Sequence, residues 1–147
     1  MRVVDTIRID APPDVVWNVT RDVERWPEWT PTVTSVRVVS DGEFGLGSVA
    51  RIRQPMQPES EWTVTVFEAG RRFAWATHRT GLRMVGTHEI AADGTGTRNV
   101  LSIDAEGPLA FMLWPVLRGA MRKALSDENR GLKACCEEVA ARTSGHS

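Results

Sequence analysis

The sequence predicts an α+β domain, in which a curved antiparallel sheet of seven strands wraps around one long C-terminal helix. Two observations predict this fold class. Between residues 32 and 106 the apolar period is mostly two, and Gly, Asp and Pro interrupt it at short intervals, as in successive hairpins. Segments 11–26 and 107–142 instead have the helical period. The 147 residues are enough for one domain with its own core.

One strand and two short helices precede the meander. Residues 2–10 alternate Ile7 and Ile9 with charged side chains, which is typical of a strand. The helix predicted over 11–26 begins with two prolines and an acidic residue. These suit a first turn, because its N–H groups have no helical partners and its dipole end is positive. Pro27 ends this helix, and a second short helix or turn ends near residue 31.

Six further strands follow as hairpins. They are expected at 32–40, 47–55, 60–68, 71–79, 82–91 and 97–106. Because successive side chains of a strand point to opposite faces, alternation selects the residues that face the helix. These are Ala50, Ile52, Gln54, Trp62, Val64, Val66, Phe73, Trp75, Thr77, Leu82, Met84, Gly86, His88, Ile90, Asn99, Leu101 and Ile103. A twisted sheet cannot close tightly on a helix at both ends, so the space between them is either packed or left as a pocket.

The C-terminal helix, predicted over 107–142, is amphipathic. One stripe collects Trp114, Leu117, Met121, Ala124, Leu125, Leu132, Cys135 and Val139. Pro115 is expected to kink the helix or to mark a later start. Glu128 lies within the stripe, where its carboxylate either reaches the helix edge or an arginine, or contacts a polar group inside a cavity. We expect Glu128 to face the cavity and to hydrogen-bond a side chain or water there, because Arg51 and Arg53 point outward.

Composition and charge argue against several function classes. The net charge of −1 gives no electrostatic argument for nucleic acid or for an anionic membrane. No apolar run approaches the roughly 20 residues that span a bilayer, and the first ten residues lack the apolar core of a signal peptide, so the cytoplasm is the expected compartment. The neighbours Cys135 and Cys136 cannot cross-link distant segments, and nothing activates them. The spacing of His78, His88 and His146 indicates no metal site.

The order of elements resembles the helix-grip fold of the START/Bet v 1-like (SRPBCC) superfamily, in which two short helices separate the first two strands. More narrowly, it resembles the bacterial group of polyketide cyclase/dehydrase and lipid-transport-like proteins. The segments that carry the resemblance are "IDAPPDVVWNVTRDVERWPEWTP", "GLGSVARIRQP", "EWTVTVFEAGRRFAW", "GTHEI", "GTR", "EGPL" and "GLKACCEE". They span nearly the whole chain, which implies one domain over 1–142 and a short flexible tail over 143–147.

The resemblance implies an apolar cavity between the helix and the sheet, since members of the group commonly enclose one. We expect a volume of a few hundred cubic ångströms, the usual range for ligand sites. The expected ligand is a small hydrophobic or amphipathic molecule of lipid or polyketide type, bound by a monomer or homodimer without metal, other cofactor or membrane insertion. The expected contacts are Trp29, Ile52, Gln54, Trp62, Val64, Phe73, Trp75, Met84, His88, Asn99, Leu101, Trp114, Leu117, Met121, Leu125 and Glu128.

Two tryptophans, Trp26 and Trp29, share one face of the turn after the first helix, at the open end of the predicted grip. They either close the core at this end or line the entrance to the cavity, because both positions accommodate large apolar surface. Trp17, one turn inside the first helix, is expected in the core. Trp62 and Trp75, at inward positions of adjacent strands, allow the same two roles.

Two other functions stay open. His88 beside Glu128 in an apolar cavity would be equipped for general acid–base chemistry, as in a cofactor-independent polyketide cyclase or dehydratase. An inward histidine is also consistent with a hydrogen-bonded core residue. A protein-interaction domain like the Hsp90-activator relatives would need an exposed apolar patch, which the sequence does not indicate.

Overall fold

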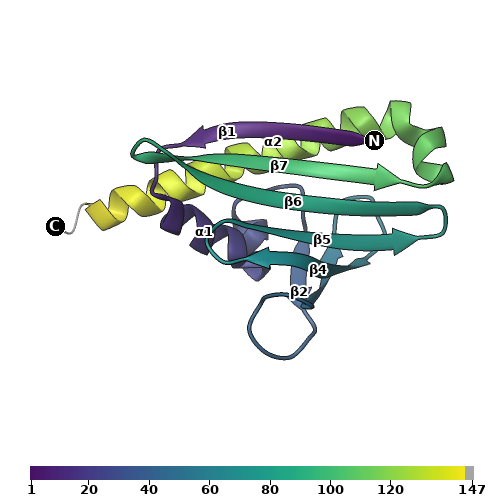
Figure 1. Cartoon of the computed structure of the whole chain (residues 1–147), viewed down its shortest axis with the longest axis horizontal. Coiled ribbons are helices and arrows are strands. Elements are labelled where there is room, and N and C mark those ends of the chain that lie inside the picture. The colour runs from purple at the N-terminus through teal and green to yellow at the C-terminus, as the bar shows by residue number, and fades with distance from the viewer. Residues whose placement is uncertain (145–147) are drawn as a thin grey trace.

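The computed structural model describes residues 1–144 and confirms the predicted α+β class (Figure 1). Seven strands form one antiparallel sheet in the order β1-β7-β6-β5-β4-β3-β2, and a long helix packs against it. The elements are β1 (Arg2–Ile9), α1 (Pro13–Arg21), η1 (Val23–Glu28), β2 (Ser35–Val38), β3 (Val49–Arg53), β4 (Ser60–Glu68), β5 (Arg72–Arg79), β6 (Leu82–Asp93), β7 (Gly96–Glu106) and α2 (Pro108–Ser144). The predicted tail from 143 is thus partly helical, and its residues 145–147 lie outside the described part.

The segment with α1 and η1 carries the chain from one edge of the sheet to the other. β1 lies at one edge beside β7, with Ile7 opposite Asn99, and β2 lies at the other edge beside β3. From β2 to β7 every strand pairs with the next one in the chain, as the short turns predict. Within residues 1–144, no helix combines the length and apolar character needed to cross a membrane.

The first helix is shorter than predicted. α1 ends at Arg21, and the residues that follow form the 3₁₀ turn η1, which contains Pro27. The indole Nε1 of Trp26 donates a hydrogen bond of 3.0 Å to the carbonyl of Thr20, near the end of α1. The carbonyls in the last turn of a helix have no N–H donor within the helix, and the Trp26 indole supplies a donor for the carbonyl of Thr20. Trp26 is thereby held under the end of α1, facing the sheet.

A β-bulge changes which residues of β4 face the core. The register between β4 and β5 shifts between Val64 and Val66, which interrupts the alternation. Val64 is buried as predicted. Beyond the bulge Phe67 packs against the core, with its ring centroid 5.5 Å from that of Trp17, so the prediction that Val66 faces inward is wrong.

α2 is one continuous helix that begins at Pro108 and runs through Pro115, so of the two alternatives for this proline the kink holds and the later start does not. Pro115 removes one N–H from the helix, and the first turns of α2 stand at an angle to the rest (Figure 1). Its buried side chains are Ala110, Met121, Leu125, Asn129, Leu132 and Cys136. Cys136 occupies the buried position that the sequence pattern gave to Cys135, which is only partly buried.

Two buried asparagines connect α2 to the sheet. Asn99 Nδ2 on β7 donates to Asn129 Oδ1 on α2 at 2.7 Å, and Asn129 Nδ2 donates to the Asp5 carboxylate on β1 at 2.7 Å. Both asparagines are fully buried. One turn further along α2, Lys133 Nζ donates to the carbonyl of Arg8 at 3.0 Å. Because buried amides need partners, these bonds fix the rotation of α2 and its position along β1.

Gly131 is a point of close approach between α2 and the turn after η1. A Cβ at this position would overlap the carbonyl oxygen of Trp29. We expect Gly131→Ala to lower the free energy of unfolding by about 1–3 kcal/mol, because two backbone segments must move apart. Chemical denaturation followed by circular dichroism measures this change.

Gly119→Ala is the matched control on the same helix. Gly119 is exposed, and nothing lies within 4 Å of where its Cβ would stand. Alanine there should raise the free energy of unfolding by up to about 1 kcal/mol through its helix propensity. Equal effects of the two substitutions would contradict the close approach at Gly131.

Candidate functional site

A cavity lies between α2 and the face of the sheet that α2 covers, and its volume is about 80 Å³. We call it the inner cavity. The strands β3 to β7 supply one wall, α2 supplies the opposite wall, and the chain around η1 supplies one end. Its lining residues are Trp26, Thr32, Val33, Ile52, Gln54, Trp62, Trp75, Gly86, Thr87, His88, Leu101, Ser102, Ile103, Ala124, Leu125 and Glu128.

Aromatic packing makes the inner cavity smaller than expected, so the predicted volume of a few hundred cubic ångströms is wrong. His88 stacks on Phe73 with ring centroids 4.6 Å apart. The ring of Trp26 lies 5.0 Å from that of His88 and 5.3 Å from that of Trp75. A Cβ at Gly86 would lie 3.4 Å from the Trp75 indole, so the missing side chain lets this indole lie across β6. The rings fill space that the sequence pattern left open.

The inner cavity brings together part of the predicted contact set. These residues come from β3 to β7 and from α2: Ile52, Gln54, Trp62, Trp75, His88, Leu101, Leu125 and Glu128. Alternation in the strands and the helical period place them on the correct faces. Their role as ligand contacts remains a prediction.

Other residues of that set do not line the inner cavity. Val64 and Phe73 lie in the packed core, and the amide of Asn99 is bonded to Asn129. Trp29 lines a groove on the outer side of α2. Met84, Trp114, Leu117 and Met121 belong to a second apolar cluster, which lies nearer the start of α2. All of these face the interior or the helices as expected, but neighbouring side chains separate them from the cavity.

Some lining residues were not predicted from the sequence. Thr32 and Val33 fall at the start of the strand predicted over 32–40, but β2 begins only at Ser35, so the two residues lie in irregular chain after η1. Ala124 lies on the predicted stripe but is small. For the tryptophans both alternatives hold in part, since Trp26 closes the core and lines the cavity, with 3% of its surface exposed. Trp29 is only partly buried.

His88 is a buried, neutral imidazole. Its exposed fraction is 7%, and among the described residues its ring has aromatic neighbours rather than charged ones. Burial lowers the pKa of His88 from 6.5 to about 3, because the surrounding rings cannot replace the water that stabilises an imidazolium. At neutral pH the ring therefore offers one N–H donor and one nitrogen acceptor.

Glu128 faces the inner cavity as predicted, and it is partly buried. Burial raises the pKa of its carboxyl from 4.5 to about 7, because the charged form loses the water that stabilises it. The expected hydrogen bond to a side chain is not found within residues 1–144. Arg51 and Arg53 point outward, as predicted, and pair there with Glu61 and Glu59.

His88 and Glu128 line the same cavity without forming an ion pair. Burial is the cause of both pKa shifts, and neither group alters the pKa of the other. Near pH 7 the cavity thus holds a neutral imidazole and a carboxyl that is close to its titration midpoint. Such a pair can donate and accept hydrogen bonds to a ligand, but it lacks the charge coupling of a histidine activated by a carboxylate.

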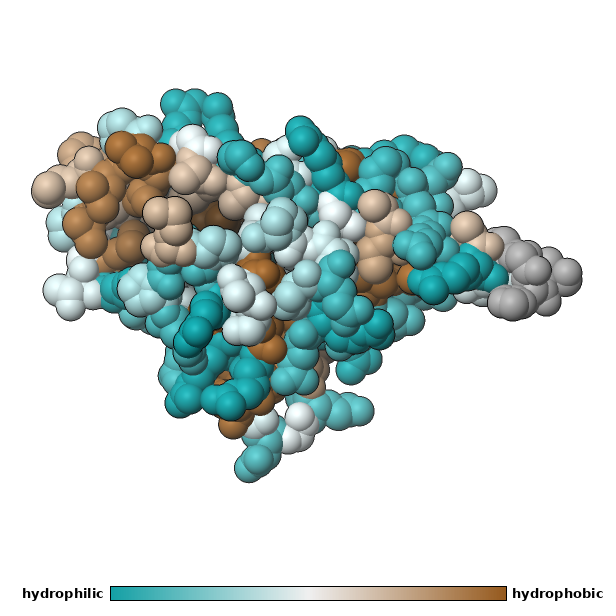
Figure 2. Space-filling view, turned by 180° about the vertical axis from the view of Figure 1, so that it is seen from behind, coloured by the Kyte–Doolittle hydropathy of each residue, from teal (hydrophilic) through white to brown (hydrophobic). Residues whose placement is uncertain are grey.

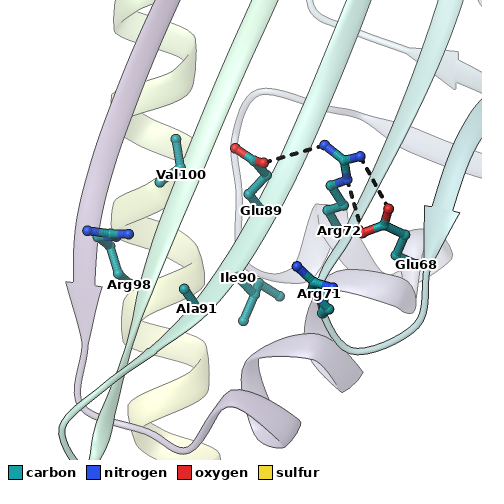
Figure 3. A pocket seen from close by; sticks show the side chains of 8 residues that line it. All are labelled: Glu68, Arg71, Arg72, Glu89, Ile90, Ala91, Arg98 and Val100. Atoms are coloured by element: carbon teal, nitrogen blue, oxygen red, sulfur yellow. Dashed lines mark hydrogen bonds and ion pairs between the residues drawn. The ribbon is translucent and has the colours of Figure 1, made fainter.

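Other hollows of the described residues are open to solvent, among them one of about 410 Å³ beside η1 and β2. A groove of about 820 Å³ runs between α1, η1 and the second half of α2, and includes Arg25, Glu28 and Cys135. Another hollow of about 390 Å³ lies over β5, β6 and β7 (Figure 3). There Arg72 is paired with Glu68 at 3.2 Å and with Glu89 at 3.8 Å.

Metal binding and thiol chemistry find no support in the part of the chain that the structure describes. Across residues 1–144, no group of three or more His, Cys, Asp or Glu side chains is placed to hold a metal ion. Both cysteines are free, and burial raises the pKa of Cys136 to about 12. A thiol with that pKa is protonated at neutral pH and is a poor nucleophile.

Comparison with known proteins gives one family match and one curated relative. Residues 1–137 match the family described as polyketide cyclase / dehydrase and lipid transport. A protein of Streptomyces cyaneus named "Putative polyketide cyclase" is 34% identical over 77 residues, which make up 52% of this chain and 43% of that protein. The chain thus spans less than half the length of this relative.

Solved structures share the fold at low identity. The protein TTHA0849 from Thermus thermophilus has a TM-score of 0.77 and 21% identity, over 95% of this chain and 99% of that one. A START superfamily protein from Mycobacterium smegmatis has a TM-score of 0.69 and 16% identity, over 97% of this chain and 98% of that one. Since the family match covers most of the sequence, the chain belongs to the polyketide cyclase/dehydrase and lipid transport family.

Proposed function

We propose that the chain binds a small, largely apolar molecule with at least one hydrogen-bonding group, and that the inner cavity is the site. The observation that carries this proposal is the make-up of the walls. Aromatic and aliphatic side chains surround the space, and a few polar groups, among them Gln54, His88 and Glu128, converge on it. This is the usual composition of a ligand site. The family description also supports a ligand-binding or polyketide-related role.

The volume of the inner cavity limits what it can hold without rearrangement. A cavity of about 150 Å³ is known to hold benzene, whereas this one measures about 80 Å³. An aromatic ligand would therefore enter only when a wall side chain moves. Leu125 and Trp62 are wall residues on opposite sides of the space, so a shift of either would enlarge it.

A polyketide cyclase or dehydratase with His88 and Glu128 as acid–base groups is the alternative, supported by the names of the family and of the Streptomyces relative. The low pKa of His88 makes the imidazole a weak base near pH 7, which argues against His88 as the general base. If His88 were the general base, His88→Gln would lower turnover of a poly-β-ketone by about 10²–10⁴-fold. Wild-type protein that binds such a compound without converting it would contradict the enzyme.

Enlarging the inner cavity should increase affinity for a small aromatic compound. Leu125→Ala removes a side chain from the cavity wall, and phenol offers both a ring and a hydroxyl that Glu128 or His88 can bond. We expect Leu125→Ala to bind phenol at least about tenfold more tightly than wild type, which corresponds to roughly 1.4 kcal/mol. Isothermal titration calorimetry measures the affinity.

Leu132→Ala is the control for this experiment. Leu132 lies on the same helix and is 2% exposed, but it does not line the inner cavity. Both substitutions should lower the free energy of unfolding by about 2–5 kcal/mol. If Leu132→Ala gains phenol affinity equally, or if neither variant binds phenol, the inner cavity is not the site.

The two buried titratable groups should give opposite dependences of stability on pH. In the folded chain Glu128 keeps its proton up to about pH 7, whereas in the unfolded chain it loses the proton near pH 4.5. The contribution of Glu128 to the free energy of unfolding therefore falls as pH rises from 4.5 to 7. In the folded chain His88 stays neutral down to about pH 3, whereas in the unfolded chain it is protonated below pH 6.5. The contribution of His88 to the free energy of unfolding therefore rises with pH over this range. Between pH 4.5 and 6.5 the two contributions oppose each other.

Single substitutions should uncover each contribution. Between pH 4.5 and 6.5, Glu128→Gln should make the slope of the free energy of unfolding against pH more positive than in wild type. His88→Gln should make this slope more negative, and each change should be up to about 1.4 kcal/mol per pH unit. Urea denaturation at a series of pH values gives these slopes. The exposed residues Glu138 and His78 provide controls, and Glu138→Gln and His78→Gln should leave the slope near that of wild type. Variants at 88 and 128 that also keep the wild-type slope would contradict the burial of both groups.

A further inference from the structure

The first turns of α2 expose apolar side chains on several sides. Phe111, Met112 and Val116 are 77%, 74% and 75% exposed, and Leu109 and Leu113 are about half as exposed. We call these five residues the tip patch. Figure 2 shows apolar side chains gathered at the end of the molecule where α2 begins. The sequence did not indicate this exposed apolar patch.

The tip patch is held in place rather than frayed. On its inner side Ala110 is fully buried. The backbone N–H of Leu109 donates to the carbonyl of Gly81, in the β5–β6 turn, at 2.9 Å. Trp114 packs into the second apolar cluster from the same turns. A fixed helix with apolar residues on its outer sides indicates a surface that another apolar phase covers.

Positively charged side chains follow the tip patch in the next turns of α2. The chain has no acidic residue between Glu106 and Asp127, whereas this segment contains Arg118, Arg122 and Lys123. Lys123 pairs with Asp127 at 2.7 Å. Within residues 1–144, Arg118 and Arg122 have no carboxylate close enough for an ion pair, and both are exposed. The net charge of −1 conceals this local positive surface.

We propose that the tip patch docks into the surface of an anionic lipid bilayer, with Arg118 and Arg122 at the level of the lipid phosphates. Arg118 and Arg122 follow Val116 by two and six residues, so both lie within about two turns of the tip patch. Interfacial helices bury apolar side chains about 5–10 Å into the boundary between headgroups and acyl chains. Cations this close to the tip patch on the same helix can pair with the lipid phosphates while the apolar side chains lie below them. The proposal concerns the outer surface and does not depend on the inner cavity.

A second copy of the chain fits this surface less well. In a two-fold symmetric contact the same patch lies on both sides, so the arginines of the two copies would approach each other. The segment from 107 to 126 contains no acidic side chain to pair with them. Like charges at the rim of an interface oppose association, whereas phosphatidylglycerol headgroups are complementary to them. Charge thus favours the bilayer.

Vesicle co-sedimentation tests the proposal with the full chain. We expect wild type to bind vesicles of equal parts phosphatidylcholine and phosphatidylglycerol, to bind phosphatidylcholine vesicles at least about tenfold more weakly, and to be released by salt. The double variant Phe111→Ser with Met112→Ser should bind the anionic vesicles at least about tenfold more weakly, because it removes buried apolar area. Arg118→Glu with Arg122→Glu should abolish the preference for anionic lipid.

Two controls match these variants. Leu46→Ser removes a side chain that is 72% exposed in the loop between β2 and β3, and Arg142→Glu reverses a charge at the other end of α2. Both should bind as wild type does. Equal binding to both vesicle types, or none to either, would overturn the proposal. So would a concentration-dependent dimer, in sedimentation velocity without lipid, that Phe111→Ser with Met112→Ser abolishes, since the patch would then join two copies.

Discussion

The arrangement of this molecule depends on one buried polar contact, the hydrogen bonds that join Asn99, Asn129 and Asp5. An unsatisfied buried amide costs about 1–3 kcal/mol, so rotations of α2 that break these bonds are unfavourable. This rotation brings Glu128, the preceding residue, to the inner cavity, and it sets Gly131 against the carbonyl of Trp29. The same contact therefore determines both where α2 meets α1 and η1 and which side chain of α2 enters the site.

Aromatic packing on the covered face of the sheet governs both the stability and the chemistry of the site. The rings around His88 bury apolar area, which stabilises the fold, and they also exclude water from the imidazole. The lowered pKa of His88, the raised pKa of Glu128 and the small volume of the cavity all have this common origin. The packing that closes the core around these two side chains is therefore also what sets their protonation states.

The two ends of α2 have different surroundings. The second half is tied to β1 through Asn129 and Lys133 and lies beside α1. The first turns extend from the end of β7, contact the β5–β6 turn, and leave most of their apolar surface uncovered (Figure 1). The second half of α2 thus covers the interior, whereas its first turns form an exposed apolar end. The α2 residues that line the inner cavity, Ala124, Leu125 and Glu128, lie between these two parts of the helix.

The sequence alone determined the seven strands, the long helix and the inward positions of His88 and Glu128, because alternation, helical period and turn residues act over a few positions. The tertiary structure alone decided the bulge in β4, the burial of Asn129, the volume of the inner cavity and the exposure of the tip patch. These features depend on partners far apart in the chain: Asn129 bonds Asn99, 30 residues away, and Asp5, 124 residues away. No local period encodes which side chains meet across such separations, so the faces were predictable while their packing was not.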